Sequence, residues 1–323
     1  MAVKILYAGS PEAAAKTLEI LYEKQSEFDF EIVGVLSNPP SAKGRHKTLT
    51  PTPVASFAIE KNLPVFTPEH LIGADREAIG TVGAELLVCF AYGHIFGPKF
   101  LGMFPLGGIN LHPSLLPKYR GCTPVNAAIL NRDKETAVTI QSITLAMDEG
   151  DILAQKIVPL DFTEDAEGLL NYSAVEGAGL ICEILKETSE KNHLPEGKKQ
   201  CGEPSYTSVI TKNDGKIDWN EAACIIESKV RGYYPDPGCW CEEKGLPLKI
   251  LKSSFLSSDD KKSIPYESEP AGKVVAFEKS EGIYVKTSDG ILVVKELQRQ
   301  GKKAMAYKDF MNGARDFVGT ILE

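Results

Sequence analysis

The chain has 323 residues, with 43% hydrophobic and 25% charged residues and a formal net charge of −8. Its length is about twice that of a typical single domain, and its composition excludes a chain dominated by disorder. No apolar run approaches the 18 or so residues of a membrane-spanning helix, and the acidic balance excludes a uniformly basic nucleic-acid binder.

The first half of the chain alternates predicted strands with predicted helices. Residues 3–8 are a compact apolar run, and residues 11–21 carry apolar side chains at helical spacing. Further strands are predicted at residues 30–36, 63–66, 85–91, 108–111 and 137–144, a long loop at 37–53, and helices at 54–60 and 168–186. This alternation predicts an open, doubly wound, mainly parallel α/β sheet of the Rossmann-like type.

The pattern changes near residues 187–206, which are rich in Glu, Lys, Gly and Pro, as in a linker between domains. Beyond it, a helix is predicted at residues 220–230. Short strands separated by turn residues are predicted at 246–251, 272–277, 282–287 and 290–297. This spacing favours a small β-barrel. We therefore predict a catalytic domain at 1–190, a linker at 191–206 and an OB-like barrel at 207–323.

The cysteines and the first residues of the chain bear on the cellular location of the protein. The seven cysteines are scattered without pairs of metal-binding type, which favours reduced thiols, no bound metal and a cytoplasmic location. The opening residues form a predicted strand rather than an export signal. We expect a monomer with no membrane partner.

The stretch from Gly107 to Gly121 carries the most chemistry. Residues i and i+2 of a strand point to the same side, so Asn110 and His112 are expected to project together from a strand end. Ligands of open α/β sheets bind at that edge. An amide donor beside an imidazole can stabilise an oxyanion and move a proton, as acyl transfer to an amine requires. His112 as a hydrogen-bonded histidine at a strand end is the structural alternative.

A second acidic loop follows another predicted strand. Asp148 is the candidate partner of His112, because a nearby carboxylate would fix the imidazole tautomer and raise its basicity. Asp151 in the same loop is the rival. A turn carboxylate that caps Glu149 and Gly150 is the structural alternative for Asp148.

These motifs resemble the signature of the folate-dependent formyltransferases. The match consists of Asn110-x-His112-x-Ser-Leu-Leu-Pro-x-Tyr-Arg-Gly121 followed by Asp148-x-Gly-Asp151. The resemblance implies that Asn110, His112 and Asp148 form the catalytic set. It also implies that 10-formyltetrahydrofolate is the formyl donor and that no metal is needed.

Within that family, the nearly full-length resemblance is to the branch that formylates methionine on initiator methionyl-tRNA. Residues 8–12, 43–45, 49–53 and 91–93 match it, as do residues 210–219, 230–238, 301–305 and 309–313 in the second half. The chain departs from the pattern at Cys122-Thr123, where two alanines are common, and in the loop before Lys43 at residues 38–41.

The resemblance also implies two binding regions. A folate pocket would use the backbone and apolar side chains of Phe90, Ala91, Tyr92, Ser114, Leu115, Leu116 and Pro117. Lys43, Arg45 and Lys47 would meet the phosphates of the tRNA acceptor end. Taken alone, basic residues in a loop are also typical of a solvated surface.

Two other functions compete with this prediction. Another folate-dependent enzyme could formylate a sugar-nucleotide amine or hydrolyse the folate, although the domains fused to such enzymes are absent from this sequence. A dinucleotide-binding Rossmann protein needs a glycine-rich turn after the first strand. Here the turn Gly9-Ser-Pro-Glu12 has a single glycine, and proline stands where the pyrophosphate would approach.

Overall fold

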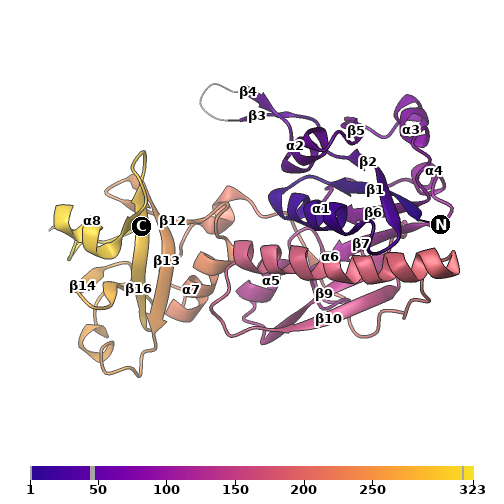
Figure 1. Ribbon diagram of the computed structural model, residues 1–323. Coiled ribbons are helices and arrows are strands. Elements are labelled where there is room, and N and C mark those ends of the chain that lie inside the picture. Colours follow the sequence, from indigo (N-terminus) through magenta and orange to yellow (C-terminus); the bar gives the residue numbers. More distant parts are fainter. Residues whose placement is uncertain (1, 44–47, 315) are drawn as a thin grey trace. The chain divides into compact units, whose positions relative to one another are not determined.

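The computed structural model describes residues 2–43, 48–314 and 316–323, with Lys43 described by its backbone alone. The chain forms two compact units (Figure 1). The first unit comprises Met1–Pro124, Glu135–Pro159 and Leu170–Ser208, and the second comprises Val125–Lys134, Leu160–Leu169 and Val209–Glu323. Within the described residues, no helix combines the length and apolar character needed to cross a membrane.

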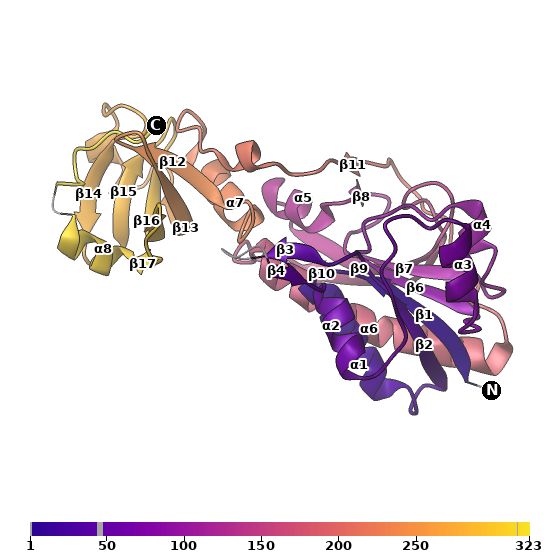
Figure 2. The ribbon, with the colours of Figure 1, turned by 90° about the horizontal axis from the view of Figure 1, so that it is seen from above.

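A seven-stranded sheet forms the centre of the first unit (Figure 2). In spatial order its strands are β10 (Ile152–Pro159), β9 (Glu135–Ser142), β7 (Gly108–His112), β6 (Leu86–Phe90), β1 (Val3–Gly9), β2 (Phe30–Leu36) and β5 (Val65–Phe66). The five strands from β7 to β5 are parallel, and β9 is antiparallel to both of its neighbours. Every residue of β1 except Lys4 is buried, as expected of a parallel strand covered on both faces.

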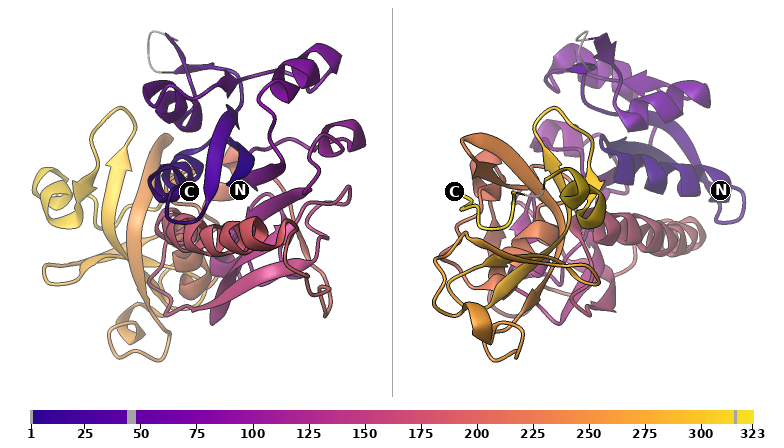
Figure 3. Two further views of the ribbon diagram at one scale, coloured as in Figure 1. Left: turned by 45° about the vertical axis from the view of Figure 1, so that its right-hand side comes forward. Right: turned by 90° about the vertical axis from the view of Figure 1, so that its left-hand side faces the viewer.

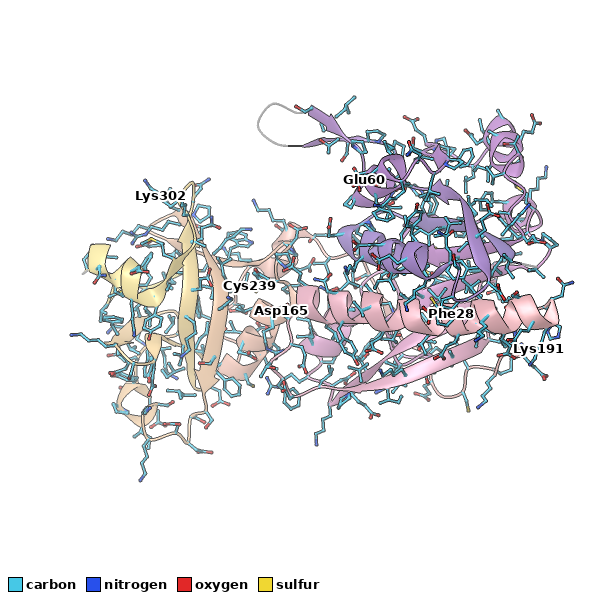
Figure 4. All side chains as sticks on the ribbon, viewed as in Figure 1. Phe28, Glu60, Asp165, Lys191, Cys239 and Lys302 are labelled. Carbon is cyan, nitrogen blue, oxygen red and sulfur yellow. The ribbon has the colours of Figure 1, made fainter. Side chains whose placement is uncertain are left out.

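Helices cover this sheet, and the sequence explains where one of them begins. These helices are α1 (Glu12–Lys24), α2 (Pro53–Glu60), α3 (Gly73–Gly80), α4 (Pro98–Leu101) and α6 (Ala166–Lys191). Helix α2 starts with proline at its first position, and the Thr52 side chain accepts a hydrogen bond from the Ala55 N–H. The Thr17 hydroxyl of α1 donates to the Ala174 carbonyl of α6, which binds the two helices together. Helix α6 ends at Lys191, labelled in Figure 4.

Some elements differ from the sequence predictions. The predicted loop at 37–53 contains two short paired strands, β3 (Ser41–Lys43) and β4 (Thr48–Thr50). The edge strand β10 was not predicted, because Gln155 and Lys156 interrupt its apolar run. Residues 192–208 of the first unit include β11 (Tyr206–Thr207), which pairs in parallel with β8 (Arg120–Gly121).

The second unit is built on an antiparallel sheet (Figure 3). Its strands run in the order β12 (Cys239–Glu243), β13 (Leu246–Leu256), β16 (Ile291–Arg299), β15 (Gly282–Lys286) and β14 (Val274–Glu278), and β17 (Met305–Ala306) pairs with β16. Helices α5 (Pro124–Leu130), α7 (Ala223–Gly232) and α8 (Tyr307–Gly313) accompany it, with 3₁₀ turns at Lys212–Gly215 and Ile264–Tyr266. A mainly parallel α/β sheet followed by an antiparallel β domain confirms the predicted fold class.

The last residues of the chain close this sheet into a barrel. On one side, the backbones of Glu242 and Glu323 exchange two hydrogen bonds, of 2.6 and 3.0 Å. On the other side, the Leu322 N–H donates to the Gly272 carbonyl and the Val274 N–H donates to the Thr320 carbonyl. The segment 319–323 therefore covers the open edges of β12 and of the chain leading into β14, which would otherwise expose unpaired backbone groups.

We expect Leu322→Ala to lower the free energy of unfolding of the second unit by about 2–5 kcal/mol, because it removes a buried side chain. Ile321→Ala is the matched control, since Ile321 is 53% exposed, and a change within about 0.5 kcal/mol is expected. Both tryptophans, Trp219 and Trp240, lie in the second unit, so denaturant unfolding followed by tryptophan fluorescence reports on it. Equal effects of the two substitutions would contradict closure by this segment.

Candidate active site

Strand β7 presents Asn110 and His112 from one face of the sheet. Leu111, which lies between them, points to the opposite face and packs against helix α6. Gly177 of α6 makes this contact possible, because a Cβ there would lie 2.1 Å from Leu111 Cδ1. The close approach of the helix therefore directs Asn110 and His112 away from α6, at the carboxyl ends of the parallel strands.

His112 is buried and both of its ring nitrogens face acceptors. Its Nε2 lies 2.9 Å from the Tyr119 carbonyl, and its Nδ1 lies 3.6 Å from Asp148 Oδ1. A carbonyl can only accept, so Nε2 carries the hydrogen in the neutral ring. Nδ1 then has a free lone pair facing the carboxylate, and uptake of one proton there would turn this contact into an ion pair.

Asp148 is held on both of its carboxylate oxygens. Oδ2 accepts from the Gly121 N–H at 2.8 Å, and Oδ1 accepts from Gln141 Nε2 at 2.8 Å. Its side chain is 13% exposed, and its backbone has a left-handed φ of 54°, which aspartate tolerates better than most residues. Asp151 instead pairs with Lys199 at 2.9 Å. The structure thus places Asp148, and not its rival, beside His112.

Asn110 is half-buried and lies between two neighbouring strands, opposite Cys89 of β6 and Gln141 of β9. Within the part of the chain that the structure describes, its side-chain amide makes no hydrogen bond. An amide at a ligand-binding edge with both polar atoms free can donate to a substrate oxygen. The site thus combines a free donor, an imidazole and a fixed carboxylate.

The candidate folate residues differ in what they can offer a ligand. The side chains of Phe90 and Tyr92 are each 2% exposed and belong to the core, whereas Ala91 between them is exposed, with a φ of 50°. Ser114 is buried, its hydroxyl donating to the Lys118 carbonyl at 2.7 Å. Leu115 is half-buried, while Leu116 and Pro117 are buried. Ala91 and Leu115 are therefore the two of these residues that are open to a ligand.

The candidate tRNA residues lie mostly beyond what the structure shows. Arg45 and Lys47 fall outside the described residues. Lys43 ends strand β3, and its backbone alone is described.

A polar network that the sequence did not predict contacts the side chain and the backbone of Asp148. It joins the side chains of Arg120, Gln141, Glu149, Gln200 and Tyr206. Arg120 belongs to the family motif, and this could have marked it as a site residue. Gln200 and Tyr206 lie in the linker-like stretch before the second unit, where the sequence shows no motif. The departure at Cys122-Thr123 also acquires a physical account, because the Thr123 hydroxyl donates to the Ser208 carbonyl at 3.0 Å.

Cys89 is a buried thiol next to Asn110. Burial chiefly, with a smaller contribution from the charge of Asp148, raises its pKa to about 12. The thiol is therefore protonated near neutral pH and is a poor nucleophile. Asn110, His112 and Asp148 remain the candidate catalytic residues.

The profile of the formyl transferase family matches residues 1–184, and that of the formyl transferase C-terminal domain matches residues 209–315. The chain belongs to the formyl transferase family. Methionyl-tRNA formyltransferases from Treponema denticola and from Treponema pallidum subsp. pallidum are 37% and 38% identical to it. The first alignment covers 98% of each chain, and the second covers 97% of each.

Solved structures share the fold. An N-formyltransferase from Helicobacter canadensis, in complex with folinic acid and dTDP-3-aminofucose, superposes with a TM-score of 0.62. It is 19% identical, and the match covers 92% of this chain and 99% of that one.

We expect Gly150→Ala to lower the rate of formyl transfer by about 10- to 100-fold. A Cβ at Gly150 would lie 1.7 Å from the Ser142 carbonyl oxygen, so the Asp148 turn must shift, and displacements near 1 Å cost about this much. Gly97→Ala is the control, because a Cβ there meets nothing within 4 Å. Steady-state kinetics of the two variants checks this, and equal activity would contradict the role of the turn.

We expect alkylation with iodoacetamide at pH 8 to label Cys122 and Cys201, which are exposed, well before Cys89. Burial raises the pKa of Cys239 and Cys89 to about 12 each, so these thiols stay protonated below that pH. Peptide mass spectrometry over time measures the order. Early labelling of Cys89 would contradict this order and would show that the carboxyl end of β6 opens readily.

Proposed function

We propose that this protein transfers the formyl group of 10-formyltetrahydrofolate to the amino group of methionine on initiator methionyl-tRNA. The observation that carries the proposal is the His112 and Asp148 pair beside the free Asn110 amide, in a family of formyl transferases. The acceptor is assigned from the curated relatives, which are methionyl-tRNA formyltransferases aligned over nearly the whole chain.

The folate donor has separate support. The family motif runs through Asn110, His112 and Asp148, and the Helicobacter canadensis structure of the same fold contains folinic acid. The exposed Ala91 and the half-buried Leu115 offer apolar contact to a flat heterocycle. We further propose that Lys43, Arg45 and Lys47 contact tRNA phosphates.

The proposed mechanism uses the free groups of the site in turn. The neutral amine attacks the formyl carbon, a C–N bond forms, and the carbonyl oxygen gains negative charge that the Asn110 amide stabilises by donating a hydrogen bond. His112 Nδ1 takes up the proton released by the amine, directly or through water, and pairs with Asp148. The proton then passes to the departing N10, the C–N10 bond breaks, and the oxygen returns to a carbonyl.

The assignment is tested by the acceptor that the protein uses. Labelled formyl transfer from 10-formyltetrahydrofolate is measured to charged initiator methionyl-tRNA, to charged elongator methionyl-tRNA and to a nucleotide-linked amino sugar. Selective transfer to the initiator is expected. Transfer only to the amino sugar would move the protein to another branch of the family, and folate hydrolysis with no acceptor would identify a hydrolase.

We expect His112→Ala to lower kcat by about 10²- to 10⁴-fold, because it removes the proton acceptor. Folate binding should persist, since His112 is buried and acts in the transition state. His193→Ala is the matched control, because His193 is exposed and its ring hydrogen-bonds to the carbonyl of the neighbouring Leu194. Unchanged turnover in a folded His112→Ala variant would remove His112 from the mechanism.

A further inference from the structure

We propose that Gln200 is a positioning residue that holds the Asp148 turn, and that Arg120 sets the orientation of its amide. The inference rests on the proposed function, in which Asp148 pairs with His112. It concerns a residue that comes 88 positions after His112 in the sequence.

Arg120, which is 8% exposed, fixes which atoms of this network donate and which accept. A guanidinium only donates, so the atom of Gln200 that it contacts must be the amide oxygen. Nε and Nη2 of Arg120 lie 3.1 and 2.8 Å from Gln200 Oε1. Arg120 Nη1 is fixed in turn by Glu149 and by the Tyr206 hydroxyl, each at 2.8 Å.

With its oxygen turned to Arg120, Gln200 presents its Nε2 to the acidic turn. Nε2 lies 2.8 Å from the Asp148 carbonyl and 2.9 Å from the Gly150 carbonyl. It also lies 3.2 Å from Gln141 Oε1. These three acceptors surround one NH₂ group, so a single amide ties both sides of the turn to the strand that carries Gln141.

The same order of donor and acceptor extends through Gln141 to the Asp148 carboxylate. Because Gln141 Oε1 faces the donor of Gln200, its Nε2 faces Asp148 Oδ1 at 2.8 Å. That oxygen is also the one nearest to His112 Nδ1. A donor-only residue thus orients two amides in series, and the second holds the catalytic carboxylate at its place.

The test replaces the donor atom of Gln200, Nε2, by an oxygen that can only accept. Gln200→Glu keeps the length of the side chain and its acceptor for Arg120, but places an oxygen against three acceptors. Gln25→Glu is the matched control: Gln25 Nε2 donates to the Tyr22 carbonyl and its Oε1 accepts from the Ile32 N–H, at the start of β2. Gln200→Met removes the donor, together with the acceptor for Arg120, without adding charge.

The full chain is assayed by single-turnover formyl transfer to initiator methionyl-tRNA, or to whichever amine the wild type accepts. We expect both Gln200 variants to lower the rate at least tenfold, with KM for the folate within about twofold, and Gln25→Glu to change neither. Wild-type transfer alone tests the proposed function, whereas the ratio of variant to wild type tests the role of Gln200.

A double-mutant cycle shows whether Gln200 acts through Asp148. In an Asp148→Asn background, Gln200→Met should change the residual rate by less than twofold. A full additional tenfold loss in that background would overturn the proposal, as would a fully active Gln200→Glu variant. Loss of the folded first unit in both Gln200 variants, seen by calorimetry, would also overturn it and assign Gln200 a structural role.

Discussion

The geometry of the first unit depends on one carboxylate held against one imidazole. Asp148 accepts the Gly121 N–H and the Gln141 amide, and this leaves its Oδ1 3.6 Å from His112 Nδ1. Because the Tyr119 carbonyl occupies the other ring nitrogen, a proton can add only at the nitrogen that faces Asp148. A hydrogen on that nitrogen would point at the carboxylate oxygen, which can only accept.

Several distant segments meet to hold this pair. The close contact of α6 at Gly177 directs His112 to its face of the sheet, and Gly150 allows the acidic turn to pass the Ser142 carbonyl. In the stretch before the second unit, Gln200 donates to the acidic turn. In the same stretch, Tyr206 and Thr207 form β11, which pairs with Arg120 and Gly121 of β8. This stretch therefore belongs to the hydrogen-bonded framework of the first unit as well as connecting it to the rest of the chain.

The second unit follows a different principle, closure of an antiparallel sheet by the end of the chain. Leu322 enters the core while the backbone of the last residues pairs on both sides. Closure matters because an exposed strand edge invites pairing with other chains. An ion pair also lies in this unit, where Glu227 accepts two hydrogen bonds from Arg231, of 2.6 and 3.0 Å.

The sequence by itself determined the alternation of strands and helices, the mainly parallel sheet and the antiparallel second half, because apolar periodicity is a local property of the chain. It also placed Asn110 and His112 on one face, since side chains alternate along a strand. Only the tertiary structure decided between Asp148 and Asp151, because both lie in one loop and their partners, His112 and Lys199, are distant in sequence. The same holds for Gln141 and Gln200, whose contacts depend on long-range packing that no local pattern encodes.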